Sequence, residues 1–178
     1  MRTPLLAIVL TLPAALACTS EASTTPEAPH EAFLRRPDRV QIFLADHPQS
    51  WGRDHREFPP GVKEEDLPHS GENFVLPQEG PELNEAQRKQ LVAAFVPASE
   101  PNPIPEKKCG FNPDIALRYW RGKTWMDVIV CLGCVQFIYI DANGKQLRSR
   151  DVGVLADYQF LNKLAKEAFP EEKFRTVW

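Results

Sequence analysis

The alternation of hydrophobic and polar residues predicts a small antiparallel sheet in the second half of the chain. Three strands are expected at residues 115–120, 124–132 and 135–140, because Val, Ile and aromatic residues are enriched there and much of the sequence alternates with a period of two. Turn residues at 141–144 then precede a more polar fourth strand, expected at 145–152.

A helical pattern borders this segment on each side. Asn84 is expected to cap a helix that ends at Pro97, and Gln87 completes a capping box. A second helix is expected over residues 156–168, where apolar residues recur at spacings of three and four. The pattern therefore predicts an α+β fold: a helix, three or four antiparallel strands and a helix, with the helices packed on one face of the sheet.

The segment 40–81 has no comparable pattern. Its apolar run at 40–44 predicts a short strand or a helical turn, and isolated aromatic residues follow among Pro, Gly and charged residues. The chain has 17 prolines, but none from Asp114 to Phe169. We therefore expect residues 40–81 to form an irregular, proline-rich arm that docks on an α+β domain over residues 82–178.

An apolar segment opens the chain and predicts a secretion signal. It runs from Leu5 to Ala17 after a single positive charge at Arg2, and it is shorter than the roughly 20 residues that a membrane-spanning helix needs. Residues 1–17 are therefore expected to be a cleaved signal peptide. The polar residues that follow, within 18–39, predict a flexible linker.

This segment ends in Ala14-Ala15-Leu16-Ala17-Cys18. The stretch resembles the lipobox of bacterial lipoproteins. The resemblance implies that Cys18 becomes the first residue of the mature chain and carries lipid, so that a membrane is the partner and the cell envelope the location. Thr19 differs from the Asp that retains some lipoproteins in the inner membrane, which favours the outer membrane, facing the periplasm. The alternative is an ordinary signal peptide with an unmodified Cys18.

Three further cysteines lie at Cys109, Cys131 and Cys134. Cysteines outside the cytoplasm tend to pair. In an extended strand the Cα atoms of Cys131 and Cys134 would lie about 10 Å apart, whereas a disulfide needs less than about 7 Å. We therefore expect Cys109 to pair with one of them. A Cys131–Cys134 bond instead requires a turn or bulge at Gly133.

The same cysteines admit two functional alternatives. Cys131 and Cys134 have the Cys-x-x-Cys spacing of thiol-redox proteins, although the following residues predict a strand rather than the helix that lowers a thiol pKa. The three cysteines with a distant His55 or His69 would make a metal site. The segments from Cys109 to Pro113 and from Val130 to Cys134 also resemble a pattern in uncharacterised secreted bacterial proteins, which implies no activity.

Charge and motifs exclude several functions without assigning one. The chain has 21 basic and 24 acidic residues, a net charge of −3, which gives no basis for nucleic-acid binding. Phosphate-binding, dinucleotide-binding and hydrolase-type Gly-x-Ser-x-Gly motifs are absent from the sequence. We therefore assign no catalytic residue, no metal and no cofactor.

Two groups of residues on the predicted strands remain as candidates. Asp127 is expected at an exposed position paired with Arg118 or another neighbour, and the alternative is a buried functional carboxylate. Tyr119, Trp120 and Trp125 surround the first hairpin and are expected to lie in the core or to cover the sheet, or else to line a binding surface.

The sequence thus predicts a lipid-anchored envelope protein whose domain is a binding or structural module. A thiol-redox or metal-binding lipoprotein that uses Cys131 and Cys134 is the alternative.

Overall fold

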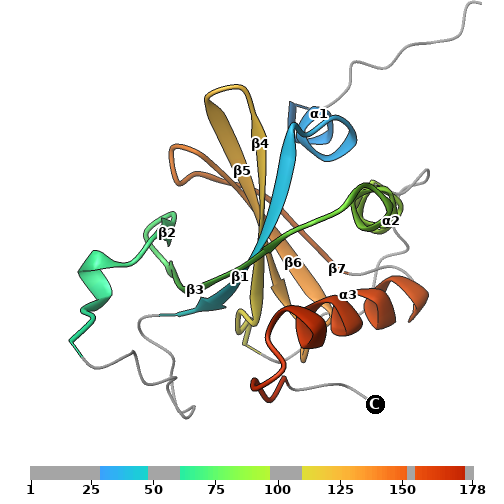
Figure 1. The fold of residues 1–178 in the computed structure, drawn as a ribbon. Helices are drawn as coiled ribbons and strands as arrows, with labels where there is room; N and C mark the ends of the chain where they lie inside the picture. Colours follow the sequence, from blue (N-terminus) through green and yellow to red (C-terminus); the bar gives the residue numbers. More distant parts are fainter. Residues whose placement is uncertain (1–28, 48–60, 97–109, 152–154, 175–178) are drawn as a thin grey trace, which may run out of the picture.

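Seven antiparallel strands form one curved sheet, a half-barrel, in the computed structural model of the chain (Figure 1). The structure describes residues 29–47, 61–96, 110–151 and 155–174. Along the sheet the strand order is β2-β3-β1-β4-β5-β6-β7. The strands are β1 (Arg39–Asp46), β2 (His69–Ser70), β3 (Phe74–Glu82), β4 (Ile115–Arg121), β5 (Thr124–Cys131), β6 (Gln136–Asp141) and β7 (Gln146–Asp151).

The predicted fold class is wrong, because the sheet is larger than the sequence pattern indicates. The four strands expected after residue 114 are present as β4 to β7, but β1, β2 and β3 extend the same sheet from the segment expected to be an irregular arm. The protein is therefore mainly a β half-barrel, rather than an α+β domain of three or four strands.

Strand β3 escaped prediction because it contains Pro77, Gly80 and Pro81. Proline is tolerated where its missing N–H would not enter a ladder, as on an edge strand. One side of β3 pairs with β1, and that pairing contains two register shifts. The other side pairs with β2 only at Phe74 and Val75. Most of β3 is thus an edge in which prolines cost little.

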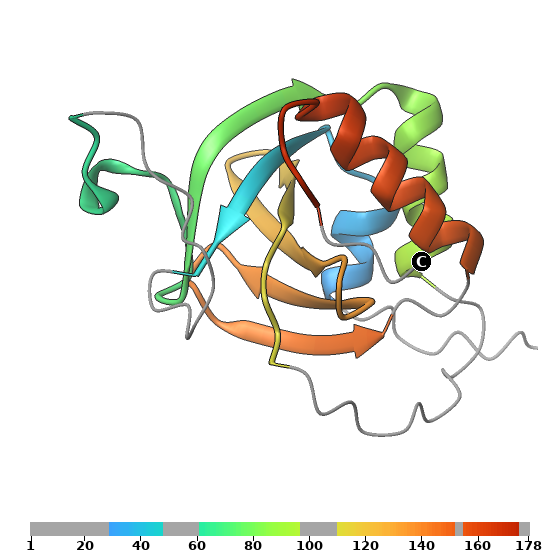
Figure 2. The same cartoon turned by 90° about the horizontal axis from the view of Figure 1, so that it is seen from below.

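Three α-helices lie together on one side of the sheet, as Figure 2 shows. They are α1 (Pro29–Arg35), α2 (Glu85–Phe95) and α3 (Leu155–Ala168). The α1 helix lies within the residues expected to be linker, and its Leu34 is buried. A short 3₁₀ helix, η1 (Glu64–Asp66), lies before β2.

The capping box of α2 is confirmed. The Asn84 side chain accepts a hydrogen bond from the Gln87 backbone N–H at 3.0 Å, and the Gln87 side chain accepts one from the Asn84 N–H at 2.9 Å. These bonds satisfy two backbone donors that a helix start would otherwise leave unpaired.

Each face of the sheet carries its own hydrophobic core. The core under the helices joins apolar side chains of α1, α2 and α3 to one face of β1 and of β4 to β6. The opposite face carries a second, smaller core, composed of Phe43, Ala45, Phe74, Leu76, Ala116, Ile129, Ile138 and Ile140. Strands buried on both faces lose the polar alternation of a half-exposed sheet, which agrees with the continuous burial of β5 from Met126 to Cys131.

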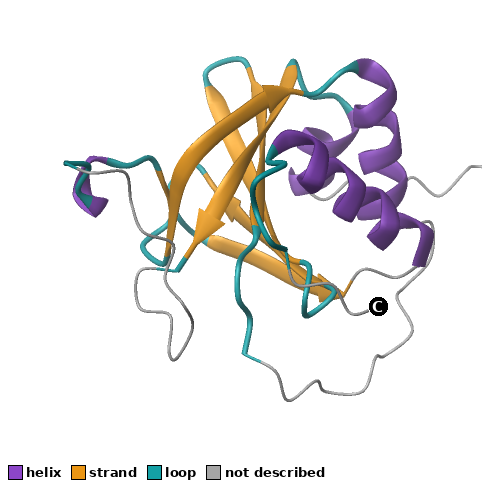
Figure 3. Ribbon diagram, turned by 60° about the horizontal axis from the view of Figure 1, so that its bottom comes forward, coloured by secondary structure: helices purple, strands orange, loops and turns teal. Residues whose placement is uncertain are grey.

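The two ends of the sheet meet at a pair of glycines. A Cβ placed on Gly71, in the turn between β2 and β3, would lie 3.0 Å from the carbonyl oxygen of Gly144, in the turn between β6 and β7. This contact brings the β2–β3 hairpin across the second core. In Figure 3 the strands curve around one side while the helices lie on the other.

Candidate functional site

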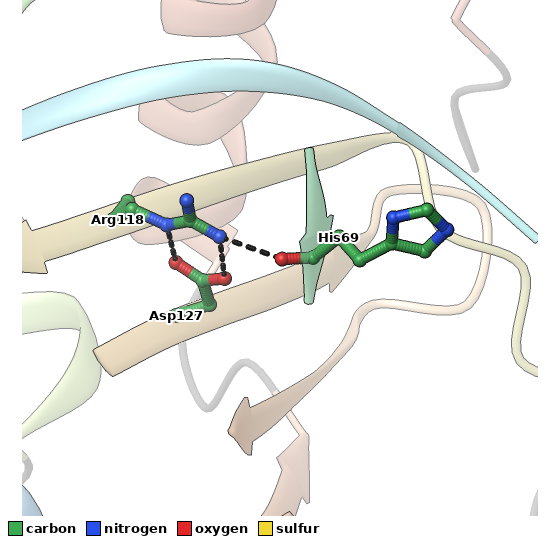
Figure 4. Close-up of polar contacts among 3 residues, drawn as sticks. All are labelled: His69, Arg118 and Asp127. Carbon is green, nitrogen blue, oxygen red and sulfur yellow. Dashed lines mark hydrogen bonds and ion pairs between the residues drawn. The ribbon is translucent and has the colours of Figure 1, made fainter. Parts of the chain in front are cut away.

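The second core contains a buried ion pair between Arg118 on β4 and Asp127 on β5 (Figure 4). The two residues are directly opposite each other in the antiparallel ladder, which places their side chains on the same face. Arg118 Nε donates to Asp127 Oδ1 and Arg118 Nη2 donates to Asp127 Oδ2, each at 2.8 Å. This is the bidentate geometry that an arginine and a carboxylate form when both are well ordered.

The β2 strand and two aromatic residues complete the surroundings of the ion pair. Arg118 Nη2 also donates to the backbone carbonyl of His69 at 2.9 Å. Its guanidinium carbon lies 4.0 Å from the ring centroid of Trp125 and 5.5 Å from that of Phe43. Stacking on aromatic faces stabilises an arginine that has lost part of its hydration.

The pairing predicted for Asp127 is confirmed, but its predicted exposure is wrong. The Asp127 side chain is 0% exposed, and that of Arg118 is 12% exposed. The sequence pattern could not show this burial. The carboxylate is covered by β2, which is distant in the chain, and by the bend of the sheet around it. Ser70 is one of these residues, and it is itself fully buried.

Burial raises the pKa of Asp127 above its ordinary value of 3.8, and the hydrogen bonds and positive charge of Arg118 act in the opposite direction. The neighbouring Ser70 hydroxyl also lowers this pKa, although Ser70 Oγ makes no hydrogen bond of standard geometry.

This cluster joins three strands of the sheet. Both carboxylate oxygens of Asp127 accept hydrogen bonds from Arg118, and the guanidinium also donates to the His69 carbonyl and stacks on Trp125. The cluster therefore ties β2, β4 and β5 together. Because 0% of the Asp127 side chain is exposed, its remaining lone pairs are out of reach of a substrate proton.

The second candidate is the cysteine pair, which forms a Cys131–Cys134 disulfide with a Cα–Cα distance of 5.2 Å. The chain reverses between β5 and β6, so the extended geometry that favoured a Cys109 bridge does not apply. The reversal places Val135 at a φ of 57°, a conformation that is rare for a β-branched residue. Cys109 and Cys18 lie outside the described residues.

The disulfide turn is buried and held by backbone contacts. Cys131 is 0% exposed and Cys134 is 4% exposed. The Cys134 N–H donates to Cys131 Sγ at 3.1 Å, and the Leu132 N–H donates to the carboxylate of the buried Asp114 at 2.7 Å. Because a thiolate must be accessible to exchange with another disulfide, this burial opposes a redox role.

The aromatic residues of the first hairpin lie on opposite faces. Tyr119 is buried in the core under the helices, whereas Trp120 packs against the second core. Trp120 and Trp125 are partners in the β4–β5 ladder, and both are half-buried. The expectation of a core or covering position is thus confirmed for Tyr119 and Trp120, and the outer part of Trp120 is accessible.

Within the described residues, no group of three or more His, Cys, Asp and Glu side chains gathers as a metal site. His69 lies beside the ion pair through its backbone, and its ring Nδ1 is 2.7 Å from the Leu67 carbonyl oxygen. His55, the other candidate ligand, is outside the described residues. In the same part of the chain, none of the helices has the length and apolarity needed to cross a bilayer.

Comparison of the chain with protein-family models, with curated proteins and with solved structures found no match.

Proposed function

We propose that the chain is a lipid-anchored protein of the bacterial cell envelope, and that its half-barrel is a binding or structural module. The observation that supports this most directly is the buried Cys131–Cys134 disulfide. Structural disulfides persist in oxidising compartments outside the cytoplasm, which agrees with the secretion signal and lipobox-like sequence that end at Cys18.

The roles of the polar interior groups also support a module without catalytic machinery. Arg118 and Asp127 satisfy each other, and Asp114 accepts a hydrogen bond from the turn that holds the disulfide. Each of these charged groups is hydrogen-bonded to a partner within the fold.

Mass spectrometry of the protein from a membrane fraction tests the anchor. The expected mature N-terminus is Cys18 carrying acyl chains, and the Cys18→Ser variant is expected to leave the membrane fraction. Several acyl chains are needed for stable attachment, because each buried methylene contributes only about 0.8 kcal/mol. A mature chain with an unmodified Cys18 would reject the lipid anchor.

A thiol-redox function is the second candidate, and one contact favours it. After reduction, the Cys134 N–H that lies 3.1 Å from Cys131 Sγ would stabilise a thiolate there. The C131A/C134A variant separates the two functions. A binding module is expected to retain its partner if the variant stays folded, whereas a redox protein is expected to lose thiol–disulfide exchange with a small dithiol.

A further inference from the structure

Positive charge gathers at one end of the half-barrel, where α1 runs into β1 and the β4–β5 turn folds back. Four exposed cationic residues lie there: Arg36, Arg39, Arg121 and Lys123, which we call the basic end. Figure 1 shows α1 and the β4–β5 turn at the same end of the molecule.

Asp38 holds the two parts of the basic end together. Its backbone N–H donates to the Trp120 carbonyl at 2.8 Å, and its carboxylate accepts from the Gly122 N–H at 2.6 Å. Arg39 is the ladder partner of Trp120. The four cationic residues therefore come from chain segments that are hydrogen-bonded to each other at this end of the sheet.

Acidic residues offset only part of this charge. Asp38 is exposed and lies within the basic end, so its carboxylate offsets one of the four positive charges. Glu31 lies 3.8 Å from Arg35, and Glu85 lies 2.7 Å from Lys89, so each has a cation of its own. The whole chain has a net charge of −3. A local excess of positive charge on an acidic protein indicates an anionic partner for this end.

An aromatic residue accompanies the charge. The Arg39 guanidinium carbon lies 3.8 Å from the ring centroid of the half-buried Trp120. Tryptophan and arginine together suit the headgroup region of a membrane, where an amphipathic ring and a cation both find favourable surroundings.

The length of chain before α1 places a membrane within reach of this surface. Cys18 precedes Pro29 by eleven residues, which span at most about 36 Å when extended. The seven-residue α1 helix adds only about 10 Å. A lipid on Cys18 would therefore leave the bilayer within reach of the basic end.

We propose that the basic end rests on anionic phospholipid headgroups of the membrane that holds Cys18. The inference deepens the proposed function and rests on it for the choice of partner. The surface would orient the half-barrel on the bilayer, with α3 directed away from it, because α3 lies at the other end of the molecule in Figure 1.

Flotation with vesicles tests the surface separately from the anchor. The protein is residues 18–178 with Cys18→Ser, so that no acyl chain contributes. We expect it to bind vesicles of phosphatidylethanolamine and phosphatidylglycerol but not of phosphatidylcholine alone. Four cationic residues less one charge for Asp38, at about fivefold per charge, give a partition coefficient of about 10² M⁻¹ at low salt, which about 10 mM lipid makes measurable. About 0.5 M NaCl should release the protein.

Two matched double variants provide the control. R121E/K123E is expected to lower binding by about 25-fold or more, and it leaves the Gly122 N–H bond to Asp38 available. K166E/K173E makes the same charge change at exposed lysines on and after α3 and is expected to bind like the parent. Thermal unfolding shows whether each variant is folded, and R36E replaces R121E/K123E if that variant is not.

Three outcomes would overturn the inference. They are equal binding to both kinds of vesicle, equal loss in the two variants, and tighter binding to a DNA duplex than to anionic vesicles, which would assign the surface to nucleic acid. Because acylation of Cys18 is measured independently, failure here leaves the anchor standing, and an unmodified Cys18 leaves the vesicle result standing.

Discussion

Asp127 illustrates how much a single residue's role depends on what covers it. The ladder position opposite Arg118 follows from the turn between the two strands, and the sequence predicts it. The burial of the carboxylate does not follow from the ladder position, because Ser70 and the β2 strand reach the carboxylate from a distant part of the chain. That covering changes the carboxyl group from a surface charge into one with a raised pKa.

The raised pKa predicts the pH dependence of Asp127. The folded chain holds the proton of the Asp127 carboxyl group more tightly than the unfolded chain does. The stabilisation that Asp127 contributes is therefore fully present below pH 3.8, and it is lost as the pH rises through the folded pKa. Asp127→Asn resembles the protonated form. We therefore expect the stability of the native chain relative to this variant to fall as the pH rises from 3.8 through the folded pKa of Asp127.

Urea unfolding of both proteins between pH 3.5 and 7 provides the measurement. Arg118→Met is the contrasting variant, since it strands the buried carboxylate and should cost about 3 kcal/mol at pH 7. If the native chain instead gained stability over Asp127→Asn as the pH rose, attraction by Arg118 would outweigh burial.

At the scale of elements, local signals predicted those parts of the chain whose partners are near in sequence. The α2 cap, the β4–β5 and β6–β7 hairpins and α3 are each specified by turn residues, by alternation or by capping residues within a few positions. The β1 and β3 strands pair with each other across about 30 intervening residues, and β3 contains two prolines. No local pattern separates such a strand from a loop.

The α2 cap gives a prediction at this scale. Asn84→Ala removes the acceptor for the Gln87 N–H and should destabilise the protein by about 1 kcal/mol. Gln87→Ala removes only the returning bond and should cost less. Chemical denaturation of the two variants checks the order, and an equal cost would show that the capping box does not contribute through the Asn84 side chain.

At the scale of the molecule, the close approach of Gly71 and Gly144 joins the first strands of the sheet to the last. Gly71 has a φ of 64°, and a Cβ there would meet the Gly144 backbone at 3.0 Å. The contact holds the β2–β3 hairpin over the second core, and with it the cover of the ion pair.

Gly71→Ala is expected to destabilise the protein more than Gly122→Ala. The two glycines have similar φ values, but no heavy atom lies within 4 Å of a Cβ at Gly122. Both variants carry backbone strain of about 1 kcal/mol, so the difference between their unfolding free energies measures the contact. Amide exchange at β2 should increase in Gly71→Ala alone, and equal stabilities would show that the hairpin is not held by this approach.

The sequence by itself determined the strands from β4 to β7 and the α2 and α3 helices, and it named Arg118 as one expected partner of Asp127, because alternation, turn residues and caps act over a few residues. Only the tertiary structure decided that residues 39–82 complete the sheet, that Asp127 is buried and that Cys131 bonds to Cys134. It also gathered the basic end from the residue after α1, from β1 and from the β4–β5 hairpin. Each of these depends on which distant segment lies against a residue, and that is set by closure of the half-barrel and not by any local periodicity.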